Sequence, residues 1–108
     1  MGWDLWLAAD TGGEELASIE GCDWNYTYNT SPMLYDAGID LKKYCGKTCE
    51  EVIDELETSI KILKDNPEKY EAMNPENGWG SYEGVTRKME LLLTAFKEHP
   101  KAIIQGWF

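Results

Sequence analysis

The sequence feature that most constrains the fold is a helical pattern of apolar residues between Thr48 and Lys64. Apolar side chains recur every three or four positions, which places them on one side of a helix: Val52, Ile53, Leu56, Ile60 and Leu63. Thr48 and Glu51 have the spacing of a capping box, in which each side chain accepts a bond from the other residue's backbone N–H. The segment therefore predicts a long amphipathic helix that must cover an apolar surface.

A second segment with the same periodicity runs from Tyr82 to Glu98 and predicts a second long helix. Its apolar side chains are Tyr82, Val85, Met89, Leu92, Leu93 and Phe96. Asn66-Pro67 should end the first helix and start a short helical turn that reaches Met73. The remaining connection, NPENGWG at residues 74–80, consists of turn-forming residues.

Both ends of the chain have the alternation typical of β-strands. Trp3, Leu5 and Leu7 alternate with other residues before a turn at residues 10–13, and AIIQGWF at residues 102–108 is a second strand. Neither strand is stable alone, so the economical arrangement pairs them in a small antiparallel sheet. We therefore expect an α+β, two-layer single domain of residues 1–108, in which the two long helices cover the sheet.

The segment DWNYTYNTSPML, residues 23–34, admits more than one interpretation. Tyr26 and Tyr28 alternate with a threonine, which would suit a third strand drawn from residues 14–29. Ser31-Pro32 fits the start of a short helix, with the serine as N-cap and the proline in the first turn.

We interpret residues 14–23, which precede that segment, as an acidic connector with Leu16 and Ile19 as anchors. After the short helix, which Gly38 should end, Ile39 and Leu41 are expected to tie a loop to the core.

Acidic residues are concentrated in the first part of the chain. The formal net charge is −10, and residues 1–40 hold eight acidic side chains and no Lys or Arg. Such a field repels nucleic acids and acidic membranes and attracts basic protein surfaces. We expect a protein partner with a basic surface, no direct nucleic-acid binding and no membrane binding. The expected acidic interaction surface comprises Asp10, Glu14, Glu15, Glu20 and Asp23.

Cysteine usage and the N-terminal composition favour a cytoplasmic protein. Three cysteines leave an odd thiol, the first residues lack the basic region of a signal peptide, and no apolar run is long enough to span a membrane. Cys22, Cys45, Cys49 and His99 are too scattered for a typical zinc site. Asp10, Asp23, Asp36 and Asp40 do not follow a calcium-loop spacing, so we expect no metal or other cofactor.

Catalytic motifs give no support for an enzyme. The sequence has no Gly-rich phosphate loop and no nucleophile in a recognisable turn, and His99 is best placed to act as a cation at a helix C-terminus. Acid–base chemistry by Asp10 or Asp23 is the least favoured of three functional hypotheses, although the sequence does not exclude it.

Two polar, aromatic segments, NYTYN at residues 25–29 and NPENGWGSYEG at residues 74–84, have a structural and a functional interpretation. In the structural one, the tyrosines belong to a sheet, the asparagines bond loop backbone and Trp79 plugs the core. In the functional one, the segments meet and offer aromatic, amide and hydroxyl groups to a sugar, nucleoside or peptide. The candidate ligand-binding residues are Asn25, Thr27, Tyr28, Asn29, Asn77, Trp79 and Tyr82.

The strand ending in DTGG, the segment NYTYNTSPM, the turn NPENGWGSYEG and the tail HPKAII together resemble a family of small uncharacterised proteins of bacteria and their phages. The positions that match its pattern are Asn25, Thr27, Asn29, Asn77, Trp79 and Gly80. Many members have a histidine where this chain has Tyr28. The resemblance implies a phage or prophage context, and it assigns no catalytic role to any residue of this chain.

These observations lead to two main functional hypotheses. The first is an acidic protein-interaction module, a phage or prophage accessory or anti-defence inhibitor that occupies a basic surface of a host protein in the bacterial cytoplasm. The alternative is a binding protein for a small nucleotide- or sugar-like ligand, with the NYTYN and NGWG loops as its walls. The sequence does not indicate the oligomeric state.

Overall fold

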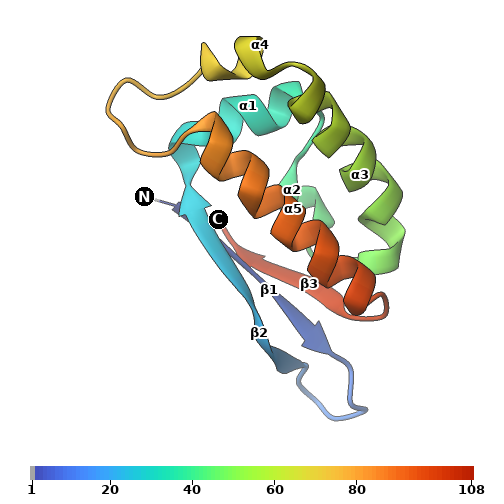
Figure 1. The fold of residues 1–108 in the computed structure, drawn as a ribbon. Coiled ribbons are helices and arrows are strands. Elements are labelled where there is room, and N and C mark those ends of the chain that lie inside the picture. The colour runs from blue at the N-terminus through green and yellow to red at the C-terminus, as the bar shows by residue number, and fades with distance from the viewer. Residues whose placement is uncertain (1) are drawn as a thin grey trace.

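The sheet has three strands, and the N-terminal strand is its centre. In the computed structural model, which describes residues 2–108, β1 (Gly2–Ala9) lies between β2 (Ala17–Thr27) and β3 (Ile103–Trp107) (Figure 1). Both neighbours run antiparallel to β1, and Leu5 lies opposite Trp24 on one side and Gly106 on the other. The predicted α+β fold, the pairing of the first and last strands, and a third strand from residues 14–29 are confirmed.

Strand β2 begins earlier than the sequence suggested. The prediction of a connector over residues 14–23 is wrong beyond Leu16, because Ala17 already belongs to β2. The register breaks along β2. Asp23 pairs with Trp6 and Ser18 pairs with Ala8, so β2 has more residues than β1 between these two pairs. The extra residues form an irregular bulge that includes Gly21, whose φ of 80° favours glycine.

Two long helices form where the amphipathic patterns predict them. Both α3 (Cys49–Asp65) and α5 (Tyr82–Glu98) contain 17 residues. The capping box at the start of α3 is present, and the Thr48 N–H donates to Glu51 Oε2 at 2.7 Å. At the start of α5, the Gly84 N–H donates to Ser81 Oγ at 3.0 Å.

The helical layer contains more than the two predicted long helices. It also includes the 3₁₀ turn η1 (Tyr28–Thr30) and the short helices α1 (Ser31–Asp36), α2 (Leu41–Tyr44) and α4 (Pro67–Glu71). Thr30 takes the N-cap position of α1 that was predicted for Ser31. Helix α2 replaces the loop expected there and buries Leu41 and Tyr44. No helix within residues 2–108 is long and apolar enough to cross a membrane.

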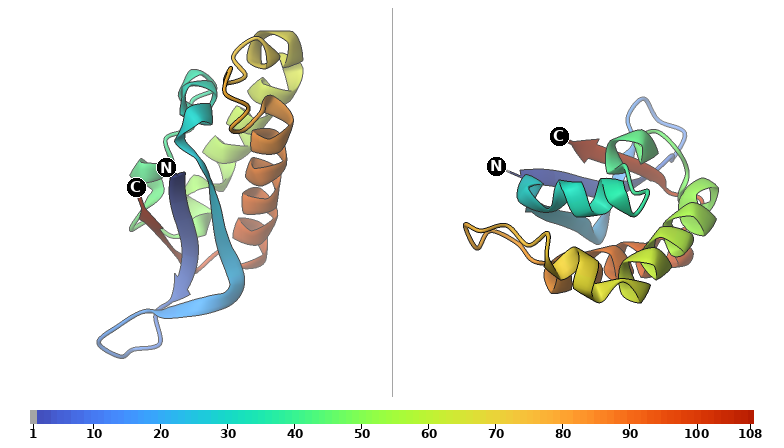
Figure 2. Two further views of the ribbon diagram at one scale, coloured as in Figure 1. Left: turned by 90° about the vertical axis from the view of Figure 1, so that its left-hand side faces the viewer. Right: turned by 90° about the horizontal axis from the view of Figure 1, so that it is seen from above.

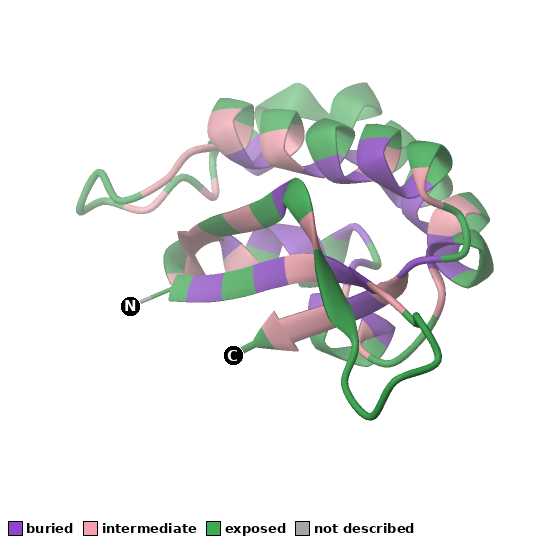
Figure 3. Ribbon diagram, turned by 90° about the horizontal axis from the view of Figure 1, so that it is seen from below, coloured by how far each residue is buried: buried purple, intermediate pink, exposed green. Residues whose placement is uncertain are grey.

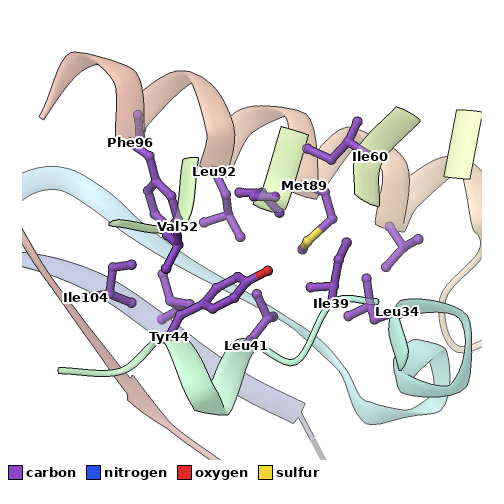
Figure 4. Packing of buried hydrophobic residues seen from close by; sticks show 14 of the residues in the cluster. Leu34, Ile39, Leu41, Tyr44, Val52, Ile60, Met89, Leu92, Phe96 and Ile104 are labelled. Carbon is purple, nitrogen blue, oxygen red and sulfur yellow. The ribbon is translucent and has the colours of Figure 1, made fainter. Parts of the chain in front are cut away.

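All of these helices lie on one side of the sheet. The left panel of Figure 2 looks towards the opposite side, with β1 and β2 in the foreground, α1 above them and α5 beside β2. The odd-numbered side chains of β1 point towards the helices, and Trp3, Leu5 and Leu7 are at most 2% exposed. Figure 4 shows Val52, Met89 and Phe96 from the long helices meeting Tyr44 and Ile104 in this core.

Candidate functional site

The segments NYTYN and NGWG, which are far apart in the sequence, are in direct contact. Tyr26 Oη accepts a hydrogen bond from the Ser81 backbone N–H at 3.1 Å. Gly80, at φ 96°, lies so close to Thr27 and Thr30 that an added Cβ would fall 2.6 Å and 2.7 Å from their methyl groups. The predicted proximity of the two segments is therefore observed.

A hollow of about 440 Å³ lies at this junction. It is lined by Gly2, Trp3, Asp4, Asn25, Tyr26, Thr27, Trp79 and Gly80. Of the residues predicted to bind a ligand, Asn25, Thr27 and Trp79 are brought together here. Trp79 is 65% exposed, so the structural interpretation in which it plugs the core is wrong.

Three other predicted ligand residues lie outside this hollow. The Asn29 side chain donates to Thr27 Oγ1 at 2.9 Å, and Asn77 Oδ1 accepts from the Trp79 N–H at 2.9 Å, so both asparagines shape their own turns. Tyr28 lines a separate cavity of about 30 Å³ that also contacts Asp40.

Tyr82, the last of the predicted ligand residues, points into the helical layer. Its hydroxyl donates to the Leu63 carbonyl at 2.7 Å, and its ring stacks on Tyr70 with ring centroids 6.2 Å apart. The Tyr70 hydroxyl in turn donates to Asp36 Oδ2 at 2.8 Å, which joins α4 to α1. These contacts give Tyr82 a structural role at the start of α5.

A larger hollow, of about 750 Å³, spans the side of the sheet opposite the core and reaches the β2 edge, where Lys88 of α5 also lines it. Asp4, Trp6, Asp23, Asn25 and Trp107 line it, together with residues 18–22 of the β2 bulge. It shares the lining residues Asp4 and Asn25 with the junction hollow, so the two are adjacent. We name the combined surface the open-face groove, defined by Asp4, Trp6, Asp23, Asn25, Trp79 and Trp107.

Three residues of this groove were not predicted as site residues: Asp4, Trp6 and Trp107. The signal that identifies them is the strand alternation, which puts Asp4 and Trp6 on the side opposite the core. Alternation alone does not show that this side is free. The strand order is also needed, because a fourth strand or further helices could cover the side that carries Asp4 and Trp6. Trp107 is 73% exposed.

The predicted acidic surface is carried by the β1–β2 hairpin. Its carboxylates Asp10, Glu14, Glu15, Glu20 and Asp23, here named the acidic hairpin, are all exposed. Figure 1 shows the hairpin extending beyond the helices, and Figure 3 shows its loop exposed throughout. Among residues 2–108, none of these carboxylates has a basic nitrogen within 4 Å, and the ion pairs present involve other acids.

The hairpin contrasts with Asp36, whose charge is matched. Hydrogen bonds from Lys69 and then from Tyr70 lower the pKa of Asp36. The Lys69 ammonium lies 2.7 Å from Asp36 Oδ2. Burial, followed by the bond to Asp36, raises the pKa of Tyr70 to about 12. An acid in the helical layer is therefore neutralised by neighbours, whereas the hairpin leaves its charge available to a partner.

The cysteines are poorly suited to nucleophilic chemistry. Burial raises the pKa of Cys22 and of Cys45, and raises that of Cys49 to about 12, so the thiolate form is disfavoured. Within residues 2–108, no three His, Cys, Asp or Glu side chains are grouped so that they could hold a metal ion. His99 follows the last residue of α5, as predicted.

Comparison of the chain with protein-family models, with curated proteins and with solved structures finds no match.

Proposed function

We propose that the protein is an acidic protein-interaction module that binds a basic surface of another protein through its acidic hairpin. The observation that carries the proposal is a projecting hairpin whose five carboxylates have no ion-pair partner among residues 2–108. Opposite charge on a partner would speed association and select the partner, because electrostatic complementarity acts strongly on both.

The partner we propose is a host nucleic-acid-binding protein in the bacterial cytoplasm, with this protein acting as a phage or prophage inhibitor of host defence. A basic cleft that binds nucleic acid recognises closely spaced negative charges. The acidic hairpin offers carboxylates in place of phosphates, and residues 1–40 contain no Lys or Arg to weaken that field.

Affinity capture from a bacterial lysate tests this proposal. Wild-type protein is compared with a variant in which Asp10→Asn, Glu14→Gln, Glu15→Gln and Glu20→Gln remove four charges. Asn at position 10 keeps an oxygen that accepts the Gly12 N–H, a bond of 2.9 Å in the native turn. We expect one stoichiometric partner at low salt, lost at high salt and lost in the variant.

The matched control removes the same number of charges elsewhere. Glu55, Glu68, Glu71 and Glu76 are exposed and have no ion pair among residues 2–108, so their change to Gln alters net charge equally. Retention of the partner by this control, and its release by added duplex DNA, would support the proposal. Loss of the partner in both variants, or no partner at either salt, would contradict it.

A second function, the binding of a small nucleotide- or sugar-like ligand, is favoured by one observation. Asn25, Thr27 and Trp79 converge on the junction hollow, which offers an indole face beside amide and hydroxyl groups. We expect a nucleoside or monosaccharide that binds there to raise the melting temperature, and Trp79→Ala to abolish the shift. Tyr35→Ala, which removes an aromatic ring that is 63% exposed and lies outside this hollow, is the control.

A further inference from the structure

The open face of the sheet carries two Asp–Trp pairs in neighbouring rows. Across β1 and β3, Asp4 lies directly opposite Trp107. Across β1 and β2, Trp6 lies directly opposite Asp23. Residues opposite each other in an antiparallel pair have their Cβ atoms about 5 Å apart and on the same side of the sheet. Each row therefore places one carboxylate beside one indole.

The two rows have the spacing of an extended peptide. Asp4 and Trp6 are separated by one residue on β1, so the rows are about 7 Å apart. In an extended chain, side chains that point the same way recur at the same interval. An extended segment lying on this face would therefore present alternate side chains to the two rows.

The chemistry of each row suits a guanidinium group. A planar guanidinium stacks on an indole face and donates paired hydrogen bonds to a carboxylate, and a lysine ammonium matches neither geometry as well. Phosphate and carboxylate ligands are disfavoured, because the hollow contains Asp4, Glu20 and Asp23 against one basic residue, Lys88. A wholly apolar segment would leave these carboxylates desolvated without a partner.

We propose that the open-face groove binds an extended Arg-x-Arg segment of the partner protein, with one arginine on Asp4 and Trp107 and the other on Asp23 and Trp6. The inference rests on the proposed function, because it names the segment that the basic partner presents. Both aspartates and Trp107 are exposed and Trp6 is half-buried, so all four side chains are accessible.

Peptide titration followed by ¹⁵N NMR tests the inference without knowledge of the partner. The probe is the peptide Gly-Arg-Gly-Arg-Gly. The indole N–H and backbone shifts of the ¹⁵N-labelled protein are read at Trp6, Trp107 and their neighbours. Three peptides are controls: Gly-Lys-Gly-Lys-Gly, Gly-Arg-Arg-Gly-Gly, and the same alternating peptide with neutral citrulline for arginine. We expect the alternating arginine peptide to bind at least about fivefold more tightly than each control.

Variants test the row formed by Asp4 and Trp107. Asp4→Asn and Trp107→Ala each change an exposed residue, and each should lower the affinity for the arginine peptide about fivefold. The triple variant Asp10→Asn, Glu14→Gln, Glu15→Gln, which leaves the groove intact, should weaken it less than either. Equal affinity for all three charged peptides, shifts confined to the hairpin loop, or groove shifts that follow protein concentration alone would overturn the inference.

Failure of this inference can be distinguished from failure of the proposed function. A lysate partner that is lost on hairpin neutralisation but retained by Asp4→Asn and Trp107→Ala would overturn the groove inference and leave the module intact. Tight binding of the arginine peptide, together with no partner in the lysate, would support the groove inference and contradict the hairpin proposal.

Discussion

The two sides of β1 differ in what they contact, although they belong to the same eight residues. On the covered side, Trp3, Leu5 and Leu7 are buried against the helices, and burial of such side chains contributes most of the folding free energy. On the open side, Asp4 is exposed and Trp6 is half-buried. A shift of one residue along the strand thus moves a side chain from the packed core to the open side of the sheet.

This difference teaches how to interpret the aromatic residues of the open side. A single exposed apolar side chain is ordinary in a soluble protein and needs no explanation. Trp6 and Trp107, however, each lie opposite an aspartate in consecutive rows, and Trp107 is 73% exposed. Packing does not require this arrangement, because the core already lies on the other side of the sheet.

The largest effect should come from the covered side. Leu5→Ala removes a fully buried side chain from the central strand and should lower the free energy of unfolding by about 3 kcal/mol. Asp4→Ala, at the adjacent exposed position, should change it by less than about 0.5 kcal/mol. Urea unfolding followed by circular dichroism measures both, and equal losses would contradict the division of β1 into two sides.

A smaller loss is expected where the two polar segments meet. Gly80→Ala introduces a Cβ at φ 96° against the methyl groups of Thr27 and Thr30, and should cost about 2 kcal/mol. Gly78 in the same turn has φ 75° but no heavy atom within 4 Å of an added Cβ, so Gly78→Ala should cost only about 1 kcal/mol. The difference in unfolding free energy measures the contact itself, and its absence would mean that the loops separate easily.

The helical layer provides a third test, through Tyr70. Tyr70→Phe removes the hydroxyl that donates to Asp36 and should cost about 1.5 kcal/mol at neutral pH. Because folding raises the pKa of Tyr70 from 10.0 to about 12, its phenol contributes stability that is present below pH 10 and lost as the pH rises towards 12. The wild-type and Tyr70→Phe stability curves should therefore converge over that interval in urea titrations. Curves that stay parallel would contradict the assignment.

The local sequence was enough to predict the elements whose periodicity and caps lie within one segment. The periodicity of Val52, Leu56 and Leu63 and the Thr48–Glu51 cap specify α3, because these interactions lie within a few turns of one helix. Helix α2 was missed because four residues carry too little pattern; it forms because Leu41 and Tyr44 are buried by the core. The start of β2 was missed because the bulge between Ser18 and Asp23 interrupts the alternation.

The candidate site was predictable only in part, because it depends on pairing across the sheet. Proximity of Tyr26 to the NGWG turn was expected from their shared polar character, and Tyr26 does accept the Ser81 N–H. Tyr82 was included for the same reason but bonds Leu63 instead, since helix α5 turns it inwards. Asp4 and Trp107 become neighbours only through the register of β1 and β3, which no local pattern encodes.

The smallest effect on stability should accompany the sharpest effect on binding. Trp107→Ala removes a side chain that is 73% exposed, so the free energy of unfolding should change by less than about 0.5 kcal/mol. The same substitution removes the indole opposite Asp4 and should lower the affinity for the alternating arginine peptide about fivefold. Measured together by urea unfolding and peptide titration, these values separate recognition from packing. A large loss of stability with unchanged peptide affinity would place Trp107 with Leu5 as a packing residue and remove the basis for treating the open side as a binding face.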